Sequence, residues 1–237
     1  MTRLVWAAAA AALLAVSGVA ACARSSDGTA IRAEASTSVT SAGTSAGTPA
    51  STAPRSTDAP ESAEPGVLET TREPVPPNAL ACVRDTSGQT AVAAVADPAA
   101  PRITVKLPDG WSATPGSGDV GALLAGPDDM VAEVTIAATP LDPAAAFTRY
   151  ADDVMARYPI STLSLLPGDF CGYSGQRLMG TWAQDPDQSL QYQDRIAHIW
   201  TNTKDYLVAV HVEAPSGTPG FDTAADVLTG EFSIVIP

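Results

Sequence analysis

Alternating hydrophobic and polar positions predict a series of β-strands in the C-terminal part of the chain. The stretches are rich in Val, Ile, Thr and aromatic residues, and turn sequences such as Pro108-Asp109-Gly110 separate them. The two longest stretches are expected to pair as a hairpin through residues 202–205 at the centre of a sheet. The predicted strands are 102–107, 121–125, 130–138, 175–183, 190–201, 206–214 and 233–236.

Two further segments have the residue spacing of amphipathic helices. Asp142 is expected to cap the first helix, with Pro143 at its first position and Pro159 after its end, and Thr218-Pro219 is expected to open the second. Strands and helices come in blocks, which predicts an α+β fold: a single domain with a curled antiparallel sheet packed with two main helices. The residues predicted on the buried helix faces are Phe147, Tyr150, Ala151, Val154, Met155 and Tyr158, and then Phe221, Ala225, Leu228 and Phe232.

The first 21 residues have the layout of a signal peptide. One positive side chain in Met1–Arg3 precedes a continuous apolar run, residues 4–16, which is shorter than the roughly 20 residues a membrane-spanning helix needs. Val19-Ala20-Ala21-Cys22 resembles the lipobox of bacterial lipoproteins, whose cysteine is lipidated and becomes the new N-terminus. We therefore predict a protein held by lipid on Cys22 at the extracytoplasmic face of the cell membrane. The alternative is an ordinary secretory peptide with an incidental cysteine.

Composition divides the remainder into a stalk and a domain. Residues 23–77 contain no Phe, Tyr or Trp and consist mainly of Ser, Thr, Ala, Gly and Pro, so they lack the apolar area to offset chain entropy. We predict that residues 22–77 form a disordered stalk with a root-mean-square reach of about 40 Å. Residues 78–237 are then one globular domain of ordinary size.

Charge and cysteine content narrow the environment of this domain. It contains 8 Lys and Arg against 19 Asp and Glu, a net charge of −11, and no basic stripe that would meet phosphates. Nucleic acid is therefore excluded as a partner. With Cys22 assigned to the lipid, Cys82 and Cys171 remain as a pair in an oxidising compartment, where we expect them to form a disulfide.

Catalytic motifs are nearly absent. The only histidines, His198 and His211, lie in predicted strands, where a structural role is the simpler interpretation. Gly172-Tyr173-Ser174-Gly175 is not a nucleophile elbow. The Gly-x-Ser-x-Gly motif of such an elbow would require glycine at position 176, where Gln176 stands. No His or Cys pair has metal-ligand spacing, and no glycine-rich phosphate loop is present. We predict no catalytic residue, no metal and no cofactor.

Aromatic side chains are the best candidates for a binding site. Flat aromatic faces suit sugars and acyl chains, and alternation places polar groups beside them on the strand 190–201. Packing in the core is the alternative for each of these side chains. The predicted ligand-binding residues are Trp111, Trp182, Tyr192, His198 and Trp200.

From about residue 101 onward, the chain resembles the Lpp/LpqN family of mycobacterial and related actinobacterial lipoproteins. The residues that carry the resemblance are the strand-Pro-Gly-Trp sequence 103–111, the helix start Leu141-Asp142-Pro143, and the passage from Leu166-Pro167-Gly168-Asp169-Phe170 through Gly175 to Trp182. The resemblance implies a PsbP/Mog1-like domain and a non-enzymatic envelope protein. It also implies binding of trehalose-type glycolipids or contact with the large transporters that export such lipids.

Three functions of different class follow from these patterns. The first is a binding module for an envelope glycolipid or a lipid-transporter partner. The second is a structural or host-interaction lipoprotein with no small ligand, and the third is an undetected hydrolase. A cleft favours the first, a filled core with an open sheet edge favours the second, and Ser174 within hydrogen-bond reach of a histidine would favour the third.

Overall fold

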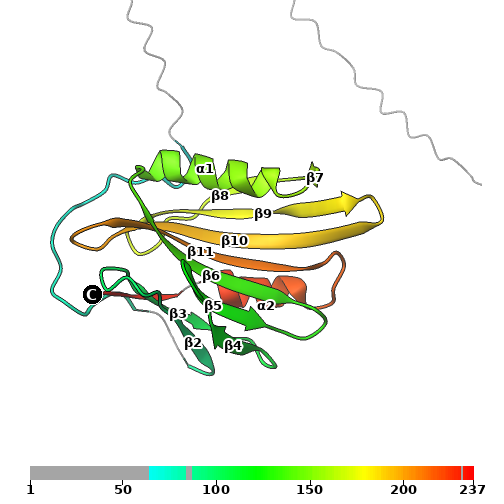
Figure 1. Ribbon diagram of the computed structural model, residues 1–237, viewed down its shortest axis with the longest axis horizontal. Coiled ribbons are helices and arrows are strands. Elements are labelled where there is room, and N and C mark those ends of the chain that lie inside the picture. The colour runs from blue at the N-terminus through cyan, green and yellow to red at the C-terminus, as the bar shows by residue number, and fades with distance from the viewer. Residues whose placement is uncertain (1–63, 84–86, 231) are drawn as a thin grey trace, which may run out of the picture. The chain divides into compact units, whose positions relative to one another are not determined.

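The computed structural model describes residues 64–83, 87–230 and 232–237, which form one compact unit of two antiparallel sheets and two helices (Figure 1). The large sheet has the order β4 (Ser112–Pro115), β5 (Val120–Ala125), β6 (Val131–Thr139), β11 (Asp205–Pro215), β10 (Gln188–Trp200), β9 (Ser174–Asp185), β7 (Ile160–Ser161), and β8 (Ser164–Pro167) also pairs with β9. The small sheet has the order β1 (Ala79–Cys82), β12 (Ser233–Ile236), β3 (Arg102–Lys106), β2 (Thr90–Ala93). The helices are α1 (Pro143–Ala156) and α2 (Phe221–Gly230).

The α+β composition agrees with the prediction, but the arrangement of the strands does not. One curled sheet was expected, whereas β3 and β12 leave the large sheet and pair with each other and with two short strands that the pattern did not reveal. The missed strands β1, β2, β4 and β8 have four residues each and β7 has two, too few for alternation to stand out from chance. The small sheet can exist because it shares a core with the large one.

The central hairpin fixes the alignment of the large sheet. β10 and β11 pair without a break from Trp200 opposite Asp205 to Leu190 opposite Pro215. β9 and β6 continue this ladder on either side, so side chains line up in rows that cross several strands. β10 and β11 are the hairpin that the sequence predicts at the centre of the sheet.

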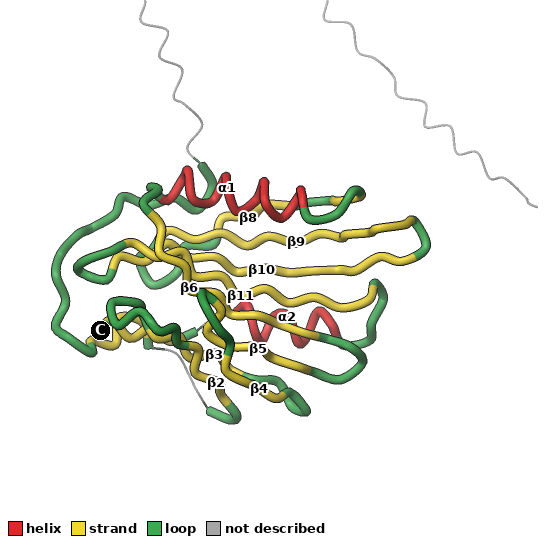
Figure 2. Tube along the Cα trace, in the orientation of Figure 1, coloured by secondary structure: helices red, strands yellow, loops and turns green. Residues whose placement is uncertain are grey.

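One face of the large sheet is closed by α2 and the small sheet. Val208, Val210 and Val212 of β11 are fully buried there, in one cluster with Phe232 and Leu228. The opposite face carries α1, so the two helices lie on different sides of the sheet (Figure 2). Because every other residue of a strand points to the same side, the two faces have separate residue sets.

Helix α1 covers only part of its face. The Asp142 carboxylate accepts the backbone N–H of Ala145 at 2.9 Å, as expected for the N-cap. Phe147 packs in one cluster with Leu178, Ile196 and Ala209, so the helix lies over β9, β10 and part of β11. It leaves β4, β5, β6 and the His211 end of β11 uncovered. Met155 was predicted on the buried face but is 39% exposed, because the helix contacts the sheet along a narrower stripe.

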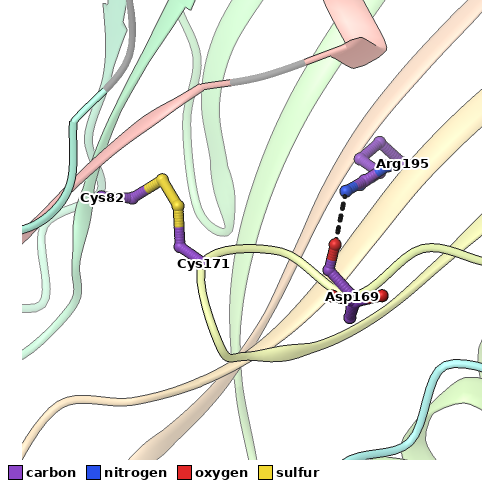
Figure 3. Close-up of a disulfide and its surroundings, with 4 residues drawn as sticks. All are labelled: Cys82, Asp169, Cys171 and Arg195. Carbon is purple, nitrogen blue, oxygen red and sulfur yellow. Dashed lines mark hydrogen bonds between the residues drawn. A yellow bond between two sulfur atoms is a disulfide. The ribbon is translucent and has the colours of Figure 1, made fainter.

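A disulfide joins the small sheet to the turn before β9. Cys82 at the end of β1 is bonded to Cys171, which has positive φ and is followed by Gly172, also with positive φ (Figure 3). Beside this turn the Arg195 guanidinium donates to the backbone oxygen of Asp169 at 3.2 Å. The disulfide expected from the cysteine count is thus present.

Residues 64–77 lie along the domain rather than apart from it (Figure 1). The Gly175 N–H donates to Gly66 O, Leu68 exchanges two hydrogen bonds with the Ser174 hydroxyl, and Asn202 exchanges two with the backbone of Val75. The expected stalk included this segment. The backbone of this segment forms hydrogen bonds with residues at the start of β9 and just after β10. Amino-acid composition alone does not predict such partners. Cys22 and the rest of the stalk lie outside the described residues.

Within the described part of the chain, neither helix has the length and hydropathy required to cross a membrane.

Candidate ligand groove

A groove of about 640 Å³ lies between α1 and the uncovered half of the large sheet. Its floor is made by β4, β5, β6 and β11, and its wall by Tyr150 and Arg157 at the helix. The lining residues are Ser112, Thr114, Leu123, Leu124, Ala125, Val131, Ala132, Glu133, Thr135, Tyr150, Arg157, His211 and Glu213.

Strand register explains why polar and apolar side chains meet in this groove. One row across the sheet runs Thr114, Leu123, Glu133, His211 and Asp194, each opposite the next on the adjacent strand. The neighbouring row places Ala125 opposite Val131, and Val131 opposite Glu213. Directly opposite side chains lie within contact distance. The floor therefore has an apolar end at β5 and β6 and a charged end at β11.

The charged end is built around a buried carboxylate. Asp194 is fully buried, and one of its oxygens contacts His211 Nδ1, while His211 Nε2 lies 3.3 Å from Glu213 Oε2. Burial lowers the pKa of His211, but Asp194 and then Glu213 outweigh it and raise this pKa to about 9. The hydrogen bond from His211 lowers the pKa of Glu213. His211 is thus an imidazolium at neutral pH, with both N–H groups directed at carboxylates.

The wall of the groove adds a phenol and a guanidinium. Burial, followed by the nearby charge of Asp194, raises the pKa of Tyr150 well above its usual value. Arg157 lies with its guanidinium carbon 4.7 Å from the centre of the Trp182 ring. Arg157 also lines the groove, and among the described residues no carboxylate lies within ion-pair distance of its guanidinium.

Two of the predicted binding residues come together beneath α1. Trp182 and Tyr192 stack with their ring centres 4.3 Å apart, and Tyr158 also stacks with Trp182, at 5.4 Å. The Tyr192 hydroxyl donates to Thr162 O at 2.8 Å. Both rings are almost wholly buried, and their centres lie 5.2 Å and 6.1 Å from that of the His211 ring, so they flank the charged end of the groove. Trp182 and Tyr158 also border a second cavity of about 530 Å³ near the β9–β10 turn.

The other three predicted residues lie elsewhere. Trp111 is buried in the core of the closed face, on the opposite side of the sheet from the groove. His198 is buried, with Nε2 3.0 Å from Leu141 O. Trp200 is half-buried, and it lines the same small cavity as His198, next to the segment 64–77. The structure therefore places the five predicted residues in three separate regions.

The arrangement expected of a serine hydrolase is not present among the described residues. The Ser174 hydroxyl donates to Leu68 O at 3.1 Å and accepts Leu68 N–H at 2.9 Å, and no hydrogen bond joins it to His198 or His211. In the same part of the chain, no group of three potential metal ligands comes together.

The sequence did not predict Glu133, Tyr150, Arg157 and Glu213 as groove residues, nor the contact between Asp194 and His211. The pairing of Asp194 with His211 follows from counting six residues away from the turn on each strand, back from Trp200 and forward from Asp205. The Asp194–His211 pairing could therefore be predicted from the register of the hairpin, once the position of the turn is known.

Comparison with solved structures finds chains of similar fold. No known family profile matches this chain, and no curated protein matches it. The chain is similar in structure to LpqN, a protein involved in cell envelope biogenesis of Mycobacterium tuberculosis, with a TM-score of 0.49 and 18% sequence identity. The match covers 62% of this chain and 91% of that one. Membership of the Lpp/LpqN family stays a prediction.

Proposed function

We propose that the chain is a cell-envelope lipoprotein, anchored through Cys22, whose domain binds an envelope glycolipid in the groove beside α1. The observation that carries this proposal is the division of one open groove into an apolar end and a charged end. Its volume of about 640 Å³ lies within the range of small-molecule sites in proteins.

The apolar end suits an acyl chain. Leu123 and Val131 stand on adjacent strands and are 45% and 43% exposed, whereas Leu124 and Val134 of the same two strands are buried. Covering such side chains contributes about 25 cal/mol for each Å² removed from water. A hydrocarbon tail lying across β5 and β6 would therefore gain affinity there.

The charged end suits a head group with several hydroxyls. Glu133 and Glu213 offer carboxylate acceptors, and Arg157 offers N–H donors without a carboxylate partner among the described residues. A hydroxyl both donates and accepts, so it can satisfy both kinds of group. His211 is held between Asp194 and Glu213 with both nitrogens engaged, which favours a fixed binding surface over proton transfer.

The direct test compares two exposed valines on different sheets. Val131→Ser changes the groove, and Val92→Ser makes the same change at a side chain 61% exposed on β2. We expect the membrane-extracted chain to bind a dodecyl glycoside of trehalose in calorimetric titration. Val131→Ser should weaken binding about tenfold, because roughly 1.4 kcal/mol of apolar contact is lost, and Val92→Ser should leave it unchanged. No saturable binding below the micelle concentration, or equal losses in both variants, would refute the groove as the site.

The anchor has a separate test. Cys22→Ala is expected to move the chain from the membrane fraction to the soluble fraction, because two acyl chains hold a protein at a membrane and their removal leaves no comparable attachment. A Cys22→Ala chain that stays in the membrane fraction after a high-salt wash would disprove anchorage through this residue. It would leave the groove assignment standing.

A further inference from the structure

Three exposed aliphatic side chains lie along one margin of the large sheet. Ile160 in β7 is 46% exposed, and Leu165 and Leu166 in β8 are 37% and 46% exposed. Both strands pair with β9 on its side away from β10, so they form the edge of the sheet beside α1 (Figure 1). We call these three residues the edge patch. Consecutive exposed leucines on a sheet edge are unusual in a protein that stays free in solution.

The chain reaches the domain at this same margin. Gln176 donates to Pro65 O at 2.8 Å, and the Gly175 N–H donates to Gly66 O at 2.9 Å. Gln176 is paired with Pro167, the residue that follows Leu166 in β8. The segment that leads back toward Cys22 therefore meets the domain next to the edge patch.

We infer that the edge patch rests on the membrane surface and sets the orientation of the domain there. The inference rests on the proposed anchorage at Cys22. From Cys22 to Glu64 there are 42 residues, which span at most about 150 Å when fully extended, so the domain stays within reach of the bilayer. A tethered domain needs only a weak contact to dock, because the tether keeps its local concentration high.

The chemistry of the contact is apolar rather than electrostatic. The domain carries a net charge of −11, so an anionic lipid surface would repel it overall. Aliphatic side chains can enter the outer part of a zwitterionic bilayer without such a penalty. Docking by this edge leaves the groove on the other side of α1 open to a ligand.

A tryptophan reporter tests this contact. The anchored chain is placed in phosphatidylcholine vesicles with brominated acyl chains, which quench tryptophan only near the hydrocarbon region. Leu166→Trp puts the reporter in the edge patch, and Val92→Trp puts it at an exposed position on the small sheet. After subtraction of the unsubstituted chain, we expect the Leu166→Trp emission to fall at least about twofold and the Val92→Trp emission to stay constant.

The outcomes separate the docking from the anchor. A chain that does not sediment with the vesicles refutes the anchorage and the docking together, whereas a chain that sediments but shows equal quenching at both reporters refutes only the docking. A reporter shielded from water but not quenched, with a dimer in native mass spectrometry, would assign the edge patch to a second copy. As a check without substitution at the patch, β8 amides should exchange several-fold more slowly in the vesicle-bound chain than in Cys22→Ala in solution. Equal rates would overturn the inference.

Discussion

The two faces of the large sheet are built from the same strands and have opposite characters. On the closed face, β11 presents Val208, Val210 and Val212, all fully buried against α2 and the small sheet. On the groove face, the alternate residues of β11 include His211 and Glu213, which are partly exposed and charged. Because one strand supplies both sets, the contrast cannot come from backbone propensity. It comes from what covers each face.

This contrast separates stability from binding within a single sheet. Closed apolar packing gains free energy from every buried atom, whereas the groove face keeps a buried carboxylate that costs free energy unless its partners remain in place. A buried carboxylate with charged partners is typical of functional sites rather than of hydrophobic cores. Substitutions on the two faces should therefore differ in size and in kind.

The largest effect is expected on the closed face. Phe232 is fully buried, with its ring centre 4.3 Å from that of Phe170, so Phe232→Ala should lower the free energy of unfolding by about 4 kcal/mol. Leu123→Ala, at a groove residue 45% exposed, should lower it by less than about 1 kcal/mol. Urea unfolding of both variants measures the difference. Similar losses would mean that the groove is closed in solution.

A smaller but still large effect is expected at the buried carboxylate. Asp194→Ala leaves His211 without its main partner and should cost about 3 kcal/mol. The pKa of His211, followed by proton NMR, should fall at the same time toward or below its usual value, since burial then acts with less opposition. The matched control is Asp153→Ala, which removes an exposed carboxylate paired with Arg149 and should change stability by less than about 0.5 kcal/mol. An unchanged His211 pKa would show that Asp194 does not hold the charge.

The smallest effect is a dependence on pH. The pKa of His211 is raised from 6.5 to about 9, so its contribution to stability is complete below pH 6.5 and is lost as pH rises through 9. The pKa of Glu213 is lowered from 4.5, so its contribution is present above pH 4.5 and is lost as pH falls below that value. The free energy of unfolding should drop by on the order of 2 kcal/mol between pH 6.5 and 10. His211→Gln should flatten that slope, and an equally steep slope in this variant would assign the pH dependence to other groups.

The sequence predicts the long elements of this fold well. Strands β6, β9, β10 and β11 and helix α1 fall within a few residues of their expected bounds, because each carries a clear period over nine residues or more. The sequence does not predict the division into two sheets. That division depends on contacts between residues far apart, such as Ala79 with Ile236, which no local pattern encodes.

The site was less accessible to sequence reasoning than the fold. The sequence predicts Trp111, Trp182 and Tyr192 from their aromatic rings, and in the structure all three are buried, with Trp182 and Tyr192 stacked on each other. The groove depends instead on where α1 stops covering the sheet, a property of helix position rather than of any residue. Glu133 and Arg157 lie in different elements, and only the folded register brings them to one groove.

The Cys82–Cys171 disulfide also has a mechanical consequence. A pulling force on the N-terminal segment is transmitted along the backbone to β1. At Cys82 the force can pass either along the backbone or through the disulfide. The bridge closes a loop with a sequence separation of 89, so tension passes to Cys171 without stretching the loop. The disulfide thereby prevents this loop from extending by about 300 Å under load. Most of the groove, including Leu123, Val131 and Arg157, lies within the shielded loop and is spared direct load on the tether.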